Sequence, residues 1–160
     1  MRVTVCNRQR RWKVNTRLLR QIAARALVLV GATEDRLNIV LVDDAAVVRL
    51  NQQFHHREGP TDILTFDYGA GDVTGELVIS VEHAVAQAKR FRSTPSRELV
   101  LYAIHGVLHL HGHDDLSPGP RTRMRAAERR LLVRLQAEYP LHSLLSACRP
   151  PKTRQASEGV

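Results

Sequence analysis

The residues best suited to chemistry are histidines gathered in one segment, since four of the eight histidines fall within residues 105–113. His105 and His109 stand four apart on a predicted helix, so their imidazoles lie on one face, one turn apart. Two ligands of one metal ion need that arrangement, and catalytic zinc sites combine three protein ligands with water. Gly112 predicts the end of the helix, and a turn there allows a residue from 113–115 to supply the third ligand. The pattern therefore predicts a metal site.

Two other interpretations of this segment bear on its chemistry. A histidine on a helix is often a buried, hydrogen-bonded core residue, and HxxxH alone is a weak signal. The metalloprotease pattern HExxH places a glutamate general base after the first histidine, but position 106 is Gly. Peptide hydrolysis is therefore disfavoured.

The elements that must hold this segment follow from periodicity and capping residues. Thr94-Pro95 predicts the start of the helix that carries the two histidines and runs to about Leu110. Further helices are expected from Thr16 to about residue 30, from Asp43-Asp44 to a polar loop at 54–62, and over 82–92 and 121–138. Strands are expected at 3–5, 37–42, 63–66 and 76–80. This order predicts an α+β (mixed α/β) fold, a roughly four-stranded sheet packed with about five helices, with the metal site at the end of a central helix.

The length of 160 residues suits one domain, which we expect to span residues 1–142, followed by a disordered tail over 143–160. Cys6 and Cys148 lie at opposite ends of the sequence with no CxxC pair, which favours a reducing compartment. No apolar run reaches the length of a bilayer span. We therefore expect a cytoplasmic protein with no membrane contact.

The charge distribution indicates a polyanionic partner. Lys and Arg number 24 against 16 Asp and Glu, which gives a net charge of +8. Residues 1–25 hold eight basic residues and no acid, residues 26–116 carry a net −6, and residues 117–138 carry +4. Basic ends around an acidic middle suit a phosphate backbone held at the edges and a cation chelated at the centre.

Several ordered motifs resemble one known family. The segment from His105 to Asp114, HGVLHLHGHD, is similar to the pattern HGxLHLxGYDH of the YbeY family, bacterial metal-dependent endoribonucleases of ribosomal RNA maturation. Residues 60–66, PTDILTF, resemble the family's PTDVLSF, and residues 75–80, GELVIS, resemble its GDIvIS strand. Leu50-Asn51, Phe54, Glu98 and the helix with Met124, Glu128 and Leu131 also have counterparts. The resemblance covers roughly residues 3–138, in the family's order.

The chain departs from the family at the third metal ligand. The family has a histidine ten residues after the first ligand, where this chain has Asp115. The resemblance therefore implies one Zn²⁺ per chain on His105, His109 and Asp115, with His113 as the rival third ligand. A carboxylate is a harder donor than imidazole, so it moves the metal preference towards iron or manganese.

A second departure concerns the catalytic arginine of the family, which falls at His55 here. By resemblance, His55 is a candidate general acid or base and Arg57 a candidate ligand of the scissile phosphate. The alternative is that residues 55–58 form only a solvated polar loop. Asp62 either orients a ligand histidine or caps a turn, and Glu98 is expected to be structural or to support a ligand.

The function implied by the resemblance is cleavage of single-stranded RNA in ribosomal RNA maturation, including the 3′ end of 16S RNA, and in ribosome quality control. The expected partners are ribosomal RNA and the small ribosomal subunit. The metal would lower the pKa of a bound water towards neutrality, and RNA would be held by Arg10, Arg11, Arg121 and Arg125. Two alternatives stay open: a non-catalytic RNA- or ribosome-binding factor with a structural metal, and another metallohydrolase.

Overall fold

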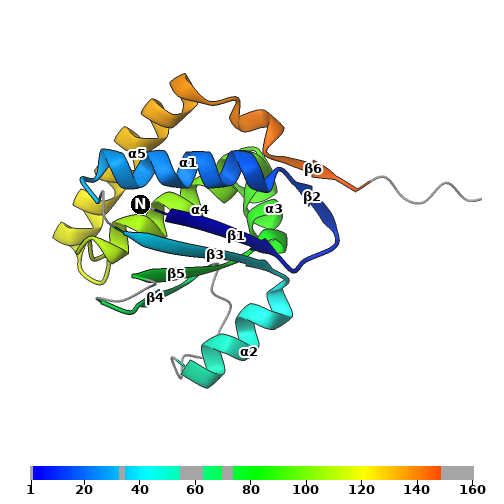
Figure 1. Ribbon diagram of the computed structural model, residues 1–160, viewed down its shortest axis with the longest axis horizontal. Coiled ribbons are helices and arrows are strands. Elements are labelled where there is room, and N and C mark those ends of the chain that lie inside the picture. Colours follow the sequence, from blue (N-terminus) through cyan, green and yellow to red (C-terminus); the bar gives the residue numbers. More distant parts are fainter. Residues whose placement is uncertain (1, 33–34, 55–62, 70–73, 149–160) are drawn as a thin grey trace, which may run out of the picture.

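A mixed four-stranded sheet forms the centre of the computed structural model, which describes residues 2–32, 35–54, 63–69 and 74–148 (Figure 1). The strand order is β1-β3-β5-β4. Three strands are parallel, β1 (Arg2–Asn7), β3 (Arg36–Val42) and β5 (Gly75–Ser80), and β4 (Ile63–Asp67) runs antiparallel to β5. A separate two-stranded sheet pairs β2 (Trp12–Val14) with β6 (Leu145–Ala147).

The described residues include five helices arranged in layers around the sheet (Figure 1). They are α1 (Thr16–Leu29), α2 (Asp44–Phe54), α3 (Val81–Arg90), α4 (Pro95–Leu110) and α5 (Pro118–Glu138), followed by the single 3-10 turn η1 (Leu141–Ser143). Helices α1, α3 and α4 lie on one face of the sheet, α5 packs on α4 and α1, and α2 lies on the other side. The α+β fold with five helices and a four-stranded sheet is confirmed.

Helix α4 is the central element because it contacts the sheet and three other helices. Its first turn is capped by Thr94, whose side chain accepts a hydrogen bond from the Arg97 N–H, and Pro95 occupies the first position. At Gly106 the helix comes so close to the sheet that an added Cβ would lie 2.5 Å from Cδ2 of Leu77. The small residue therefore sets the distance between the histidine-bearing end of α4 and strands β4 and β5.

Two apolar clusters stabilise this arrangement. The larger one fills the space between the sheet and α1, α3, α4 and α5, with completely buried side chains such as Ile22, Ile39 and Ile104. Each such side chain contributes about 1.5–3 kcal/mol through burial. The smaller cluster joins α2 to the opposite face of the sheet through Val42, Val47, Leu64 and Val78.

The structure differs from the sequence-based expectations at the ends of elements and of the domain. Strands β2 and β6 were not expected, and residues 143–148, which the sequence places in the tail, include β6. The end expected at residue 142 therefore falls before the last strand, and residues 149–160 lie outside the described residues. Helix α5 begins at Pro118 rather than at residue 121, and α1 is capped by Asn15 rather than Thr16.

Candidate metal centre

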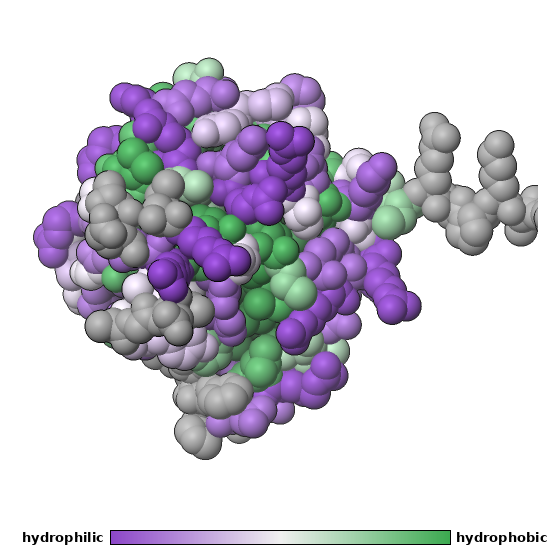
Figure 2. Space-filling model, in the orientation of Figure 1, coloured by the Kyte–Doolittle hydropathy of each residue, from purple (hydrophilic) through white to green (hydrophobic). Residues whose placement is uncertain are grey.

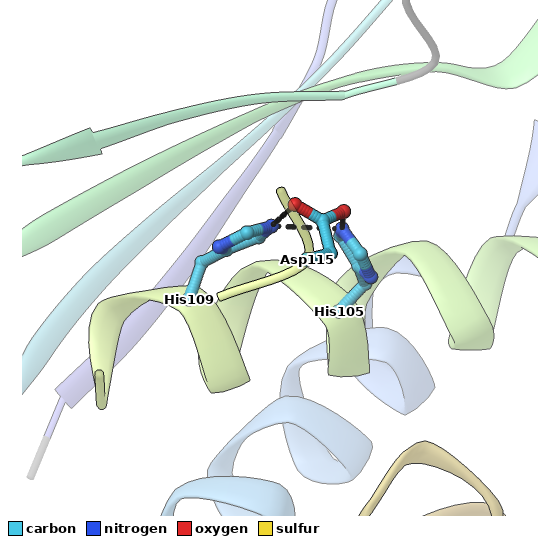
Figure 3. A group of neighbouring side chains, drawn as sticks. All are labelled: His105, His109 and Asp115. Atoms are coloured by element: carbon cyan, nitrogen blue, oxygen red, sulfur yellow. Dashed lines mark hydrogen bonds and ion pairs between the residues drawn. The ribbon is translucent and has the colours of Figure 1, made fainter. Parts of the chain in front are cut away.

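His105 and His109 project from the last two turns of α4 toward the same point (Figure 3). Their Nε2 atoms are 2.9 Å apart, and the two rings are nearly perpendicular, with centroids separated by 4.5 Å. Both side chains are about one quarter exposed. The spacing of four residues on one helix thus gives the convergence that the sequence predicts.

Asp115 reaches the same point because the chain reverses after α4. Gly112 has φ +87°, in the left-handed region that glycine adopts without steric cost, and its N–H donates to the carbonyl of His109. Oδ2 of Asp115 lies 3.4 Å from Nε2 of His105, and Oδ1 of Asp115 lies 3.7 Å from Nε2 of His109. Figure 3 shows the carboxylate lying between the two rings.

These three residues fit a divalent transition metal. One donor atom from each of His105, His109 and Asp115 lies within 4.8 Å of the other two, and all three residues are partly buried. Two imidazole nitrogens with one carboxylate oxygen are a donor set of catalytic zinc sites and of two-histidine iron sites. Within the part of the chain that the structure describes, the group has three donors rather than the four of a closed structural zinc site.

Sequence reasoning noted Glu128 of α5 only as a family counterpart and missed its contact with the candidate site. Its carboxylate is hydrogen-bonded to Nδ1 of His105, while Nε2 of the same ring faces His109 and Asp115. A carboxylate acceptor on one ring nitrogen fixes the tautomer and orientation of a ligand histidine. One signal was present in the sequence, since Glu128 adjoins the buried positions Met124, Ala127 and Leu131, where an acid on an otherwise apolar face needs a partner.

Helix α5 also holds the loop that carries Asp115. Nε of Arg121 donates to the backbone carbonyl of Asp115 over 3.0 Å. Arg121 and Glu128 therefore connect α5 to two different candidate ligands, Asp115 and His105. Arg125 is exposed and lies between them on the helix, one turn after Arg121 and three residues before Glu128, so it shares their side of α5.

The two neighbouring histidines are not members of the three-residue group. The backbone N–H of His113 donates to the backbone carbonyl of Leu108. The ring of His111 makes two other contacts: its Nδ1 lies at 2.7 Å from the carbonyl oxygen of Val107, and its Nε2 lies at 2.9 Å from a carboxylate oxygen of Asp35. The turn at residue 112 thus favours Asp115 over His113 as the third donor.

The other predicted site residues occupy different places. Glu98 is buried in the first turn of α4, where the helix dipole favours a carboxylate. The carboxylate that supports a candidate ligand, by a hydrogen bond to Nδ1 of His105, belongs to Glu128. His55, Arg57 and Asp62 lie outside the described residues. Arg10 and Arg11 are exposed at the turn between β1 and β2, and a guanidinium nitrogen of Arg11 lies 3.6 Å from Glu82 of α3.

Comparisons with known proteins show the family of the chain. A family model described as endoribonuclease YbeY matches residues 4–136, so the chain belongs to that family. An endoribonuclease YbeY of Rhodopirellula baltica is 38% identical over 127 residues, 77% of this chain and 66% of that relative. An endoribonuclease YbeY of Geobacter metallireducens is 30% identical over 147 residues, 86% of this chain and 98% of the relative.

The fold is also known from a solved structure. The solution structure of a Thermotoga maritima protein matches with a TM-score of 0.64 at 25% identity, covering 95% of this chain and 99% of the other. None of the helices in the described ranges is long and apolar enough to span a bilayer.

Proposed function

We propose that the protein is a metal-dependent endoribonuclease that acts on single-stranded RNA in ribosomal RNA maturation. The observation that carries this function is the convergence of His105, His109 and Asp115, because the chain belongs to the endoribonuclease YbeY family, the two histidines match the family motif and Asp115 stands at the position of its third ligand. In this proposal the three side chains hold one divalent ion per chain. Zn²⁺ is the expected ion, and the Asp115 carboxylate also suits manganese or iron.

The chemistry divides between the ion and the residues around it. When bound, the ion supplies Lewis-acid polarisation of a phosphodiester oxygen and acidifies a water ligand. Glu128 holds His105 in the tautomer whose Nε2 accepts the ion, and Arg121 keeps the Asp115 loop against α5. The exposed guanidinium of Arg125, on the same side of α5, is proposed to bind a backbone phosphate.

Four further roles are proposed from the positions of residues in the family motifs. His55 is proposed to move a proton at the cleaved bond, and Arg57 to bind the scissile phosphate. Asp62 is proposed to orient a ligand or cap the turn before β4, and Glu98 to have a structural role in α4. His55, Arg57 and Asp62 belong to residues 55–62, outside the described part of the chain.

The proposed setting is the cytoplasm, with ribosomal RNA and the small ribosomal subunit as partners. The two strongly basic segments of the sequence, residues 1–25 and 117–138, support a polyanionic partner. The names of the similar proteins, each an endoribonuclease YbeY, support RNA as the substrate. Processing of the 3′ end of 16S RNA and ribosome quality control are the roles that the family resemblance supports.

Incubation of the zinc-loaded protein with a labelled single-stranded RNA tests this function. The wild-type chain is expected to cut the RNA, and His109→Ala is expected to lose both the cleavage and the bound metal. Arg20→Gln, which removes an exposed charge from α1, is the control and is expected to cut normally. Equal cleavage by the wild type and His109→Ala would show that the metal centre is assigned to the wrong residues.

A further inference from the structure

A groove of about 810 Å³ lies at the small two-stranded sheet. It is lined by Gln9, Arg10, Trp12 and Lys13 and, from the paired strand and the residue after it, by residues 146–148. Figure 1 shows β2 and β6 at the end of the molecule where the described chain stops, whereas the metal centre lies toward the C-terminal end of α4. The groove is therefore separate from the metal centre.

Hydrogen bonds fix both chain segments that line this groove. The buried side chain of Gln9 accepts from the N–H of Trp12 over 2.9 Å and donates to its carbonyl over 2.7 Å, which sets the turn that presents Arg10. Across the sheet, Lys13 pairs with Ser146. The Ser96 hydroxyl of α4 accepts from the N–H of Leu145 over 3.0 Å. A ligand therefore meets a preformed surface with little ordering cost.

The surface around the groove is strongly cationic, and Arg10 and Lys13 are the cations that line the groove itself. Residues 2–32 and 139–148 contain no acidic residue, and Arg8, Arg10, Arg11 and Lys13 are all exposed. Glu82 of α3 approaches this surface, but the side chain of its partner Arg11 stays 77% exposed. In Figure 2, drawn in the orientation of Figure 1, hydrophilic side chains predominate at the end where β2 and β6 lie.

Trp12 adds an aromatic surface to this cationic setting. It is partly buried, packs against the main core and lines the groove. Proteins hold single-stranded nucleic acid with two kinds of side chain: cations bind the phosphate backbone, and aromatic rings stack on the bases. An acidic peptide would use the cations but would leave the ring without a stacking partner.

We propose that this groove binds a segment of single-stranded RNA, with one base against Trp12 and backbone phosphates on Arg10 and Lys13. The choice of RNA rests on the proposed function. Ser96, which is bonded to β6, precedes His105 by nine residues on α4, so about 14 Å of helix axis separates the two. The groove therefore holds RNA several nucleotides away from the bond that is cut, as an anchoring site rather than a catalytic one.

The sequence contains a single tryptophan, so the fluorescence of the full-length chain reports directly on this groove. Titration with a 12-nucleotide single-stranded RNA, with EDTA present to prevent cleavage, is expected to quench the fluorescence. The double variant Arg10→Gln/Lys13→Gln is expected to bind about 25-fold more weakly at 0.1 M salt, since each phosphate contact on a single strand contributes a salt slope of about 0.7. Its plot of log affinity against log salt is expected to be shallower by about 1.4.

The matched control is Arg20→Gln/Lys89→Gln, which removes the same charge from exposed sites on α1 and α3. It is expected to quench and bind nearly as the wild type does. The proposal is overturned if RNA binds without quenching, if the groove variant binds as the control does, or if an acidic peptide quenches equally at the same salt. RNA cleavage by the metal-loaded wild type without any quenching would remove the groove proposal and leave the proposed function in place.

Discussion

Replacing Glu128 with alanine is expected to weaken metal binding although Glu128 is not itself a ligand. The Glu128 carboxylate is hydrogen-bonded to Nδ1 of His105, which leaves Nε2 of that ring facing Asp115 and His109. Without the acceptor, the imidazole can rotate and can place its proton on either nitrogen. The imidazole then has the correct orientation, with its proton on Nδ1 and Nε2 free for the ion, for only part of the time.

The size of the effect follows from the exposure of the pair. Loss of such a supporting carboxylate typically lowers metal affinity by about 10- to 100-fold, or about 1.4–2.8 kcal/mol. A hydrogen bond to a charged group contributes about 1.5–3 kcal/mol, which agrees with that range. The Glu128 side chain is 20% exposed and that of His105 25%, so water replaces part of the lost bond. We therefore expect the lower end, about a tenfold loss of affinity.

Zinc affinity measured by competition with a chromophoric chelator tests this value. Glu128→Gln keeps an acceptor oxygen without the charge, so its affinity is expected to fall between those of wild type and Glu128→Ala. Glu138→Gln removes the other acid of α5 and is expected to bind zinc normally. An unchanged affinity in Glu128→Ala, with the metal-free variant folded by circular dichroism, would refute the role assigned to this carboxylate.

Three further predictions concern the ligand loop and the outer helices. Asp115→His is expected to raise the affinity for zinc relative to manganese in the same competition assay, because imidazole is a softer donor than carboxylate. Gly112→Ala is expected to lower stability in thermal unfolding by roughly 1–2 kcal/mol through backbone strain alone, since φ is +87° and nothing lies within 4 Å of an added Cβ. A hydrogen bond from Arg25 lowers the pKa of Glu138 below its usual value near 4.5. The stabilisation from this pair is therefore expected to be complete above that pH and to disappear as the pH falls through the lowered pKa, so the Tm difference between wild type and Arg25→Gln should vanish in acid.

The central elements of the fold were predictable because their signals are local. Thr94-Pro95 and Gly112 define the two ends of α4, and the apolar spacing of Met124, Leu131 and Leu135 defines the buried face of α5. Strands β2 and β6 have only three residues each, which is too short for a periodic pattern, and Trp12 pairs with Ala147 from the other end of the chain. Such a pairing depends on tertiary structure rather than on local sequence.

The candidate metal centre was predictable in part for the same reason. Helix geometry alone brings His105 and His109 together. The residues themselves left 113–115 open for the third donor, and the backbone turn at Gly112 favours Asp115. The contact between Glu128 and His105 joins two helices, so it depends on how α5 packs against α4.

The pairing of β2 with β6 has a consequence for the order in which the molecule is made. During synthesis the N-terminal part emerges first, and residues 12–14 must wait for residues 145–147 before this small sheet can form. An incomplete nascent chain therefore exposes the edge of β2 and lacks residues 146–148, which line part of the groove. Closure of this sheet is a late step, which delays RNA capture at that end until translation of the domain is complete.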